Sequence, residues 1–207
     1  MHRDWVAWHR AYDEPGSPLA RRLTVVRGHL RRWLDIAPAG PLRAISICAG
    51  EARDVLPVLA DHPRGTDVKA RLVELDPINA AAARREAREG VEVVEGDAST
   101  TDAYTGAVPA DLIVACGVFG NISDDDVRRT VSLFPMLAAP RATVVWTRHR
   151  RTPDKTNAIR EWFAEHGFAE VEFDAPDDDM FAVGVHRLVA SPMPFEGRRR
   201  LFTFVGH

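Results

Sequence analysis

The stretch LRAISICAGEARD, residues 42–54, decides the fold of this chain. Its run of small and β-branched apolar residues, 44–48, predicts a buried parallel strand that passes directly into a turn at Ala49 and Gly50. Apolar residues at helical spacing begin at Val55, so the predicted order is strand, glycine turn and helix. Such a turn brings backbone N–H groups and a helix N-terminus close to a ligand, which predicts a nucleotide-binding element.

The spacing of small residues in this turn separates two kinds of nucleotide site. A dinucleotide fingerprint, G-x-G-x-x-G, needs glycine or a near equivalent at Cys48, Gly50 and Arg53, and a bulky arginine in third place disfavours NAD binding. The stretch instead resembles the first motif of class I S-adenosylmethionine-dependent methyltransferases, an acidic residue followed by x-G-x-G-x-G. Ser46, Cys48, Gly50 and Ala52 occupy the marked places, so only one of the three glycines is present.

A second motif follows at the end of the apolar run 68–75. Asp76 is predicted to cap a helix whose first residue is Pro77. Glu74, at the carboxyl end of the strand, then faces the ligand crevice, where a carboxylate accepts hydrogen bonds from both ribose hydroxyls. The sequence VELDP is similar to the family's second motif, and the resemblance likewise places the ribose-binding acid at Glu74.

The third motif is Gly96-Asp97-Ala98, after a short strand at 91–94. It is similar to the family motif in which an acid accepts from the adenine amino group and the next backbone N–H donates to the ring. The alternative is a glycine turn in which Asp97 caps a short helix. The two interpretations are compatible.

Residues 111–118, DLIVACGV, form the most apolar predicted strand and are expected at the sheet centre beside the first strand. Because ligands bind at the carboxyl ends of the strands where the strand order reverses, we expect Cys116, Gly117, Val118, Phe119 and Asn121 beside the reacting sulfonium. Turn formation by Gly120 and Asn121 is the alternative explanation of this loop.

The acidic run Ser123-Asp-Asp-Asp126 has two interpretations. Clustered acids hold magnesium in catechol-type methyltransferases. We favour helix initiation, with Ser123 as N-cap and three acids in the first turn.

The rest of the chain predicts further strands at 142–147 and 169–173, with a helix between them that begins near Pro153. Residues 181–189 are expected to form a strand or part of a substrate cover, and residues 201–205, LFTFV, a closing edge strand. His149 follows the strand at 142–147, and its ordinary pKa near 6.5 makes it the first candidate for a general base. A solvated loop histidine is the alternative.

Two predicted helices, 4–12 and 19–34, precede the first strand. They are expected to pack on the body of the protein or to form a lid. The WHxxYD segment resembles that of small bacterial members of the family, in which an N-terminal tyrosine and an arginine hold the methionine carboxylate. Tyr12 and Arg22 are the corresponding candidates, and an arginine fork suits a carboxylate.

Composition narrows the class of partner. Hydrophobic residues make up 45% and charged residues 28%, which is typical of a globular protein, and the net charge of -3 favours neither nucleic acid nor anionic membrane. Two cysteines give no disulfide framework, and no signal peptide or apolar run of about 20 residues is present, so we expect a cytoplasmic protein that acts on small molecules.

Together these patterns predict an α/β fold: a doubly wound, Rossmann-like, mostly parallel seven-stranded sheet with an antiparallel end strand and an N-terminal helical cap. We expect a single methyltransferase domain over 1–207, with the cap at 1–37 and the core at 42–207. The resemblance implies S-adenosylmethionine as cofactor and methyl transfer to an oxygen or nitrogen of a small metabolite. The alternatives are an NAD(P)-dependent oxidoreductase and a noncatalytic adenosylmethionine-binding protein. The oligomeric state is not predicted.

The candidate cofactor-binding residues are Tyr12, Arg22, Cys48, Ala49, Gly50, Glu51, Glu74, Leu75, Asp97, Ala98, Cys116 and Gly117, the candidate catalytic residues are His149 and Asn121, and no metal ligand is expected.

Overall fold

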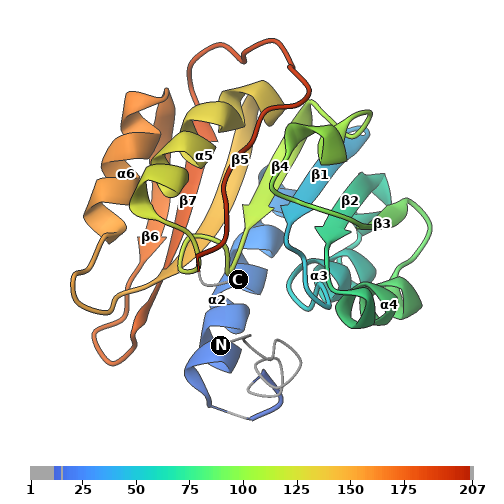
Figure 1. The fold of residues 1–207 in the computed structure, drawn as a ribbon. Helices are drawn as coiled ribbons and strands as arrows, with labels where there is room; N and C mark the ends of the chain where they lie inside the picture. The colour runs from blue at the N-terminus through green and yellow to red at the C-terminus, as the bar shows by residue number, and fades with distance from the viewer. Residues whose placement is uncertain (1–11, 15, 206–207) are drawn as a thin grey trace.

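A computed structural model of the chain describes residues 12–14 and 16–205. Seven strands form one sheet in the order β3-β2-β1-β4-β5-β7-β6 (Figure 1). Neighbouring strands pair in parallel from β3 to β5, whereas β7 runs antiparallel to both β5 and β6. The predicted doubly wound, mostly parallel sheet is confirmed. The antiparallel strand lies one position in from the edge.

The strands are β1 Leu42–Ile47, β2 Val68–Glu74, β3 Val91–Glu95, β4 Ala110–Ala115, β5 Ala138–His149, β6 Phe168–Asp174 and β7 Phe181–Leu188. The helices are α2 Pro18–Ile36, α3 Val55–Asp61, α4 Pro77–Glu86, α5 Asp124–Leu137 and α6 Thr156–Glu165, and the 3-10 turns are η2 Gly65–Asp67 and η3 Thr101–Tyr104. Within the described residues, no helix is long and apolar enough to cross a membrane.

The sheet separates two apolar layers. Helices α5 and α6 cover one face, and their buried residues include Val131 and Phe163. Helices α2, α3 and α4 cover the other face, with Leu30, Leu56 and Ala83 among the buried residues. Strand order reverses between β1 and β4, which pair directly. That reversal is where an open α/β sheet forms a ligand crevice.

Helix α2 confirms the helix predicted at 19–34. Ser17 caps it, with the side-chain oxygen accepting from the Ala20 N–H at 3.1 Å, and Pro18 is the first residue. The buried residues Val26, Leu30 and Trp33 follow helical spacing and pack on the sheet. The helix predicted at 4–12 lies outside the described residues, apart from Tyr12.

The C-terminal prediction is partly wrong. Of the predicted segment 181–189, residues 181–188 do enter the sheet, as β7, but residues 201–205 do not form a closing edge strand. They belong to what we call the C-terminal strap, residues 189–205, which crosses the α5–α6 face (Figure 1). Leu201 donates its N–H to the Ser99 carbonyl at 2.7 Å and Val205 donates to the Asn121 carbonyl at 3.1 Å. The strap therefore pairs with loops, leaving only two isolated bridges.

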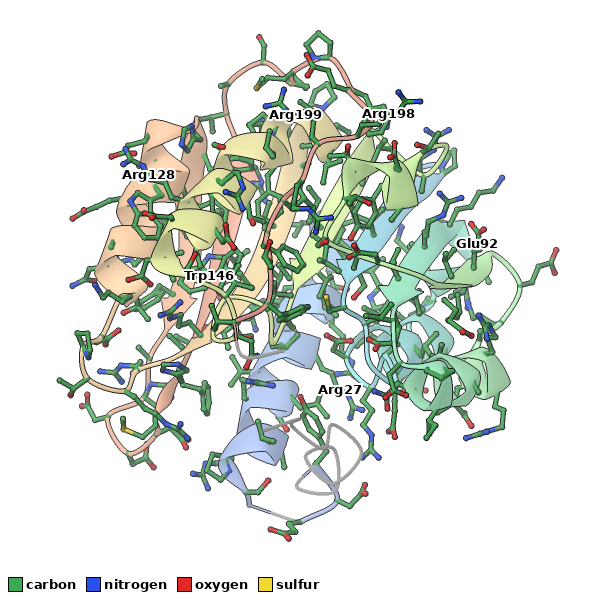
Figure 2. All side chains as sticks on the ribbon, viewed as in Figure 1. Arg27, Glu92, Arg128, Trp146, Arg198 and Arg199 are labelled. Atoms are coloured by element: carbon green, nitrogen blue, oxygen red, sulfur yellow. The ribbon has the colours of Figure 1, made fainter. Side chains whose placement is uncertain are left out.

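The face under α5 and α6 holds a cluster of aromatic side chains around His186. The imidazole stacks on Phe163 with ring centroids 4.2 Å apart, and its Nδ1 accepts from Trp146 Nε1–H at 3.1 Å. Trp146, which is labelled in Figure 2, stacks on Phe163 of α6 with ring centroids 5.9 Å apart. Because Nδ1 is the acceptor, the proton of the neutral ring lies on Nε2, which faces Glu170 at 3.7 Å.

Burial lowers the pKa of His186 to about 4, although Glu170 acts in the opposite direction. Between pH 6.5 and 4 the unfolded chain therefore binds a proton that the folded chain does not, so stability falls as pH falls. Over this window we expect His186 to remove up to about 3 kcal/mol from the free energy of unfolding. His186→Gln should flatten the pH dependence of denaturant midpoints between pH 6.5 and 4.

His166→Gln, at the end of α6, is the matched control and should leave that pH dependence as it is in the wild type. Equal slopes for wild type and His186→Gln would contradict a buried neutral imidazole.

Candidate functional site

The turn after β1 has an unusual backbone. Cys48, Gly50 and Ala52 have φ angles of 53°, 58° and 55°, the left-handed region that favours glycine. These are the three glycine positions of the motif that the sequence resembles. A side chain in this conformation costs roughly 1–2 kcal/mol, so Cys48 and Ala52 keep the glycine-type backbone against their own preference. The turn thus has the backbone conformation expected of the three-glycine motif, although two of the three positions are not glycine.

Glu74 holds this turn to the next one. Its Oε2 accepts the Gly50 N–H at 2.7 Å, and its Oε1 accepts the Asp76 N–H at 2.8 Å. The side chain is buried at the end of β2, with 8% of its surface exposed. A carboxylate has about four acceptor positions, so two remain for hydroxyl donors from a ligand. Glu74 thus has a structural function that the sequence interpretation did not include.

Asp76 caps α4, as predicted. Its Oδ1 accepts from the N–H groups of Ile78 at 2.8 Å and Asn79 at 3.2 Å, and Pro77 is the first helical residue. The loop after β3 shows a similar local bond, in which Asp97 Oδ1 accepts the Ser99 N–H at 2.8 Å. Asp97 therefore belongs to a turn, as the alternative interpretation predicted, but it does not cap a helix: the next helical turn, η3, has Thr100 at its N-cap and no side-chain capping bond. About half of the Asp97 side chain is exposed, and its Oδ2 lies 3.8 Å from Arg200 Nη1.

The end of β4 is held by hydrogen bonds from two directions. The Gly117 N–H donates to Thr147 Oγ1 at 2.9 Å, and Asn121 Nδ2 donates to the Gly117 carbonyl at 2.6 Å. Burial raises the pKa values of Cys48 and Cys116 well above the ordinary range, which keeps both as neutral thiols. The tips of β1 and β4 therefore offer small uncharged side chains to whatever lies between them.

Charged groups gather where α2 and residues 12–13 meet the turn. Arg22 Nη2 donates to Tyr12 Oη at 2.7 Å, and the Arg53 guanidinium lies over the Tyr12 ring, 5.7 Å from its centroid. Arg53 also pairs with Asp13 and Glu51, each at 2.5 Å. Burial raises the pKa of both Tyr12 and Asp54. Arg53, which disfavoured a dinucleotide site, here connects Tyr12 and Asp13 to the turn.

These groups surround one cavity of about 520 Å³, a size that suits a nucleotide-like ligand. It lies at the carboxyl ends of β1 and β4, where strand order reverses. The predicted residues that line it are Tyr12, Cys48, Ala49, Gly50, Glu51, Glu74, Leu75, Asp97, Ala98, Cys116 and Gly117. Arg22 reaches it through Tyr12.

Comparison with known proteins places this architecture. No family model matches the sequence, and no curated protein matches it significantly. Magnesium protoporphyrin IX methyltransferase from Synechocystis PCC 6803, solved with bound SAH, is similar at TM-score 0.67 and 12% identity over 89% of this chain and 93% of that one. The N-methyltransferase NodS from Bradyrhizobium japonicum WM9 is similar at TM-score 0.61 and 16% identity, over 85% of this chain and 99% of that one. The chain has the class I methyltransferase fold.

The same fold also serves other chemistry. The [4+2]-cyclase SpnF is similar at TM-score 0.59 and 12% identity, over 85% of this chain and 82% of that chain. Its name describes a cyclase and not a methyltransferase. At these identities the class I methyltransferase fold is established for this chain, and the reaction has to be argued from the site.

The two candidate catalytic residues do not line the cavity, and the expectation that Val118 and Phe119 lie beside the sulfonium is wrong, because both are fully buried in the core. His149 ends β5, and its Cδ2 lies so close to Gly120 that a Cβ there would be 3.1 Å away. Its Nδ1 is buried without a hydrogen-bond partner among the described residues. Asn121 supports the Gly117 carbonyl, in keeping with the turn interpretation. The structure thus groups the predicted cofactor residues and separates them from the predicted base.

The acidic run at Ser123 initiates α5. Ser123 Oγ accepts the Asp126 N–H at 3.1 Å, and three acids occupy the first turn. Asp126 accepts from the Thr203 N–H at 2.8 Å and also pairs with Arg129. The preferred helix-initiation interpretation is confirmed.

Eight residues that line the cavity in this class I fold were not among the predicted site residues: Leu23, Val26, Ala52, Arg53, Asp54, Asp76, Asn79 and Phe204. Leu23 and Val26 of α2 were interpreted as core residues, because helical spacing identifies an apolar face without showing what that face contacts. Ala52 could have been predicted from its position in the first motif. Phe204 lies far along the chain and had none.

The cap at Asp76 supports a simple prediction. Asp76→Ala should lower the free energy of unfolding by about 0.5–2 kcal/mol, because α4 loses the acceptor for two N–H groups. Asp76→Asn should retain most of the stability, since asparagine caps about as well. Urea denaturation of the three proteins measures this, and equal stability of the alanine variant and the wild type would contradict the capping role.

Proposed function

We propose that this chain binds S-adenosylmethionine and transfers its methyl group to an oxygen or nitrogen of a small-molecule acceptor. The observation that carries the proposal is the buried Glu74 carboxylate in the wall of the β1–β4 cavity, beside a turn with three left-handed residues. This is where a ribose with two vicinal hydroxyls finds two acceptor oxygens. The class I methyltransferase fold supports it, since the protoporphyrin enzyme holds SAH in its own structure.

The cavity offers distinct surroundings to each part of this cofactor. Asp97 and the Ala98 N–H are proposed to recognise the adenine edge, with Leu75 against its face. Leu75 is a large apolar side chain left 66% exposed at the cavity, and a bound base would bury it. An exposed apolar residue beside polar groups is the usual composition of a ligand site.

The methionine end is proposed to lie at Tyr12, Arg22 and the turn 48–51. The Arg22–Tyr12 hydrogen bond presents a guanidinium and a phenol together, which suits a carboxylate. Cys116 and Gly117 would lie beside the sulfonium, where uncharged groups leave the methyl accessible. Because the sulfonium is already an excellent leaving group, the protein mainly has to align the acceptor and exclude water.

His149 is proposed as the base for an acceptor that must lose a proton. Asn121 is proposed to hold the shape of the loop after β4 through its hydrogen bond to the Gly117 carbonyl. Burial, and then Arg148 and Arg151, lower the pKa of His149, so the ring is neutral at pH 7 and can accept a proton. Because His149 is not among the residues that line the cavity, the acceptor has to extend toward the end of β5. We further propose that residues 1–207 act as one domain in the cytoplasm.

The cofactor assignment predicts selective stabilisation. At a hundredfold excess over its Kd, S-adenosylhomocysteine should raise the melting temperature by about 5–10 °C, whereas NADH and NADPH should leave it unchanged. Differential scanning fluorimetry measures this directly. Stabilisation by a nicotinamide nucleotide alone would favour the oxidoreductase alternative.

The matched variants for that experiment are Glu74→Ala and Glu92→Ala. Glu74→Ala should weaken S-adenosylhomocysteine binding by about 1–3 kcal/mol in calorimetry, because a charged partner of the ribose is lost. Glu92 is an exposed glutamate of β3 that pairs with Arg71, and its removal should leave affinity unchanged. Equal affinities for both variants would reject the role of Glu74.

His149 gives a prediction on rate. His149→Ala should slow methyl transfer by about 100-fold or more with little change in cofactor affinity, since only the proton acceptor is removed. In the wild type the rate should fall at pH values below 6.5, because protonation of a base with a lowered pKa abolishes its function. Release of S-adenosylhomocysteine at saturating acceptor measures both. A loss of only a few-fold would mean that positioning alone supplies the acceleration.

A further inference from the structure

The C-terminal strap brings an aromatic side chain into the wall of the cavity. Phe204 lines it together with Asp97, Ala98 and Gly117. The adjacent backbone fixes where this ring lies. Leu201 pairs with the Ser99 carbonyl, and Val205 pairs with the Asn121 carbonyl. The strap therefore spans from the loop after β3 to the loop after β4, and Phe204 lies between those two contacts.

The strap is a fixed part of the fold. Leu201 and Phe202 have 0% of their surface exposed, and the Thr203 N–H donates to Asp126 Oδ2 at 2.8 Å. The Leu201 carbonyl accepts from Thr130 Oγ1 at 2.9 Å. The Phe204 ring meets Phe202 edge to face with centroids 5.2 Å apart. A ligand that contacts Phe204 meets a side chain whose backbone is already in place, which reduces the ordering cost of binding.

The strap also has the alternation of an extended segment. Thr203 and Val205 are exposed, Val205 at 61%, whereas Phe202 is buried and Phe204 turns toward the cavity. On the same segment, Arg200 Nη1 donates to Ser99 Oγ at 2.8 Å and lies 3.8 Å from Asp97 Oδ2. The strap thus approaches the Asp97–Ser99 loop at two points.

We propose that Phe204 forms the aromatic wall of the adenine subsite, which makes the C-terminal strap part of the cofactor site. Leu75 would contact the other face of the base, and Asp97 would accept from its edge. Aromatic side chains stack on purine rings through their π faces, and Phe204 supplies such a face in this wall. The inference rests on the proposed function, because it assigns a residue to the cofactor that the function requires.

The test compares Phe204→Ala and Phe204→Leu with Val205→Ala, using calorimetry with S-adenosylhomocysteine and with 5′-methylthioadenosine. The second probe keeps the adenine and lacks the amino-acid end. Phe204→Ala should weaken both by the same factor, roughly 5- to 150-fold, as expected for loss of one base–aromatic stack. Phe204→Leu keeps apolar volume and should lose part of that factor. A further variant, Phe204→Tyr, keeps the aromatic ring and should bind both probes with the affinity of the wild type. Val205→Ala should also bind like the wild type.

The outcomes separate the two proposals. Wild type that binds neither probe overturns the proposed function, and this inference with it. Wild type that binds both, with unchanged affinity in the Phe204 variants, overturns the inference alone. A loss confined to S-adenosylhomocysteine would place Phe204 at the methionine end and also overturn it. Circular dichroism of each unliganded variant checks the fold, and Phe204→Leu decides the question if Phe204→Ala does not fold.

Discussion

The carboxylate of Glu74 connects the two turns on which the whole site depends. It accepts one backbone N–H from the turn after β1 and one from the turn after β2, at 2.7 and 2.8 Å, inside the protein. A buried carboxylate without hydrogen-bond donors destabilises the folded state, and so do buried backbone N–H groups without an acceptor. Here the carboxylate and the two N–H groups satisfy each other. The cavity wall is shaped by this exchange before any ligand arrives.

The turn after β1 shows what a motif encodes physically. Two of the three glycine positions carry Cys48 and Ala52, yet all three keep a left-handed backbone. The surrounding contacts must therefore outweigh a conformational cost of roughly 1–2 kcal/mol at each non-glycine residue. Small side chains suffice because the close approach of backbone to ligand needs space more than it needs glycine itself.

Local patterns predicted much of this molecule. The strands of the parallel half and the caps at Asp76 and Ser123 follow from periodicity and helix-start signals that act over a few residues. The predicted part of the cavity lining came instead from the motifs that resemble those of the methyltransferase family and from the position of the strand ends. Residues 201–205 of the strap were wrongly predicted to form an edge strand because the segment is short and aromatic, whereas its backbone partners, Ser99 and Asn121, lie about 80 to 100 residues earlier in the chain. The composition of a short segment does not show which groups its backbone bonds to.

The fold alone does not determine the reaction, since a cyclase and methyltransferases share it, so the reaction has to be inferred from the residues of the site. The most direct test of the account is a crystal structure of the chain with S-adenosylhomocysteine. The account predicts both ribose hydroxyls within hydrogen-bonding distance of the Glu74 carboxylate and adenine between Leu75 and Phe204. A nucleoside bound elsewhere, or one in this cavity with its ribose away from Glu74, would contradict it.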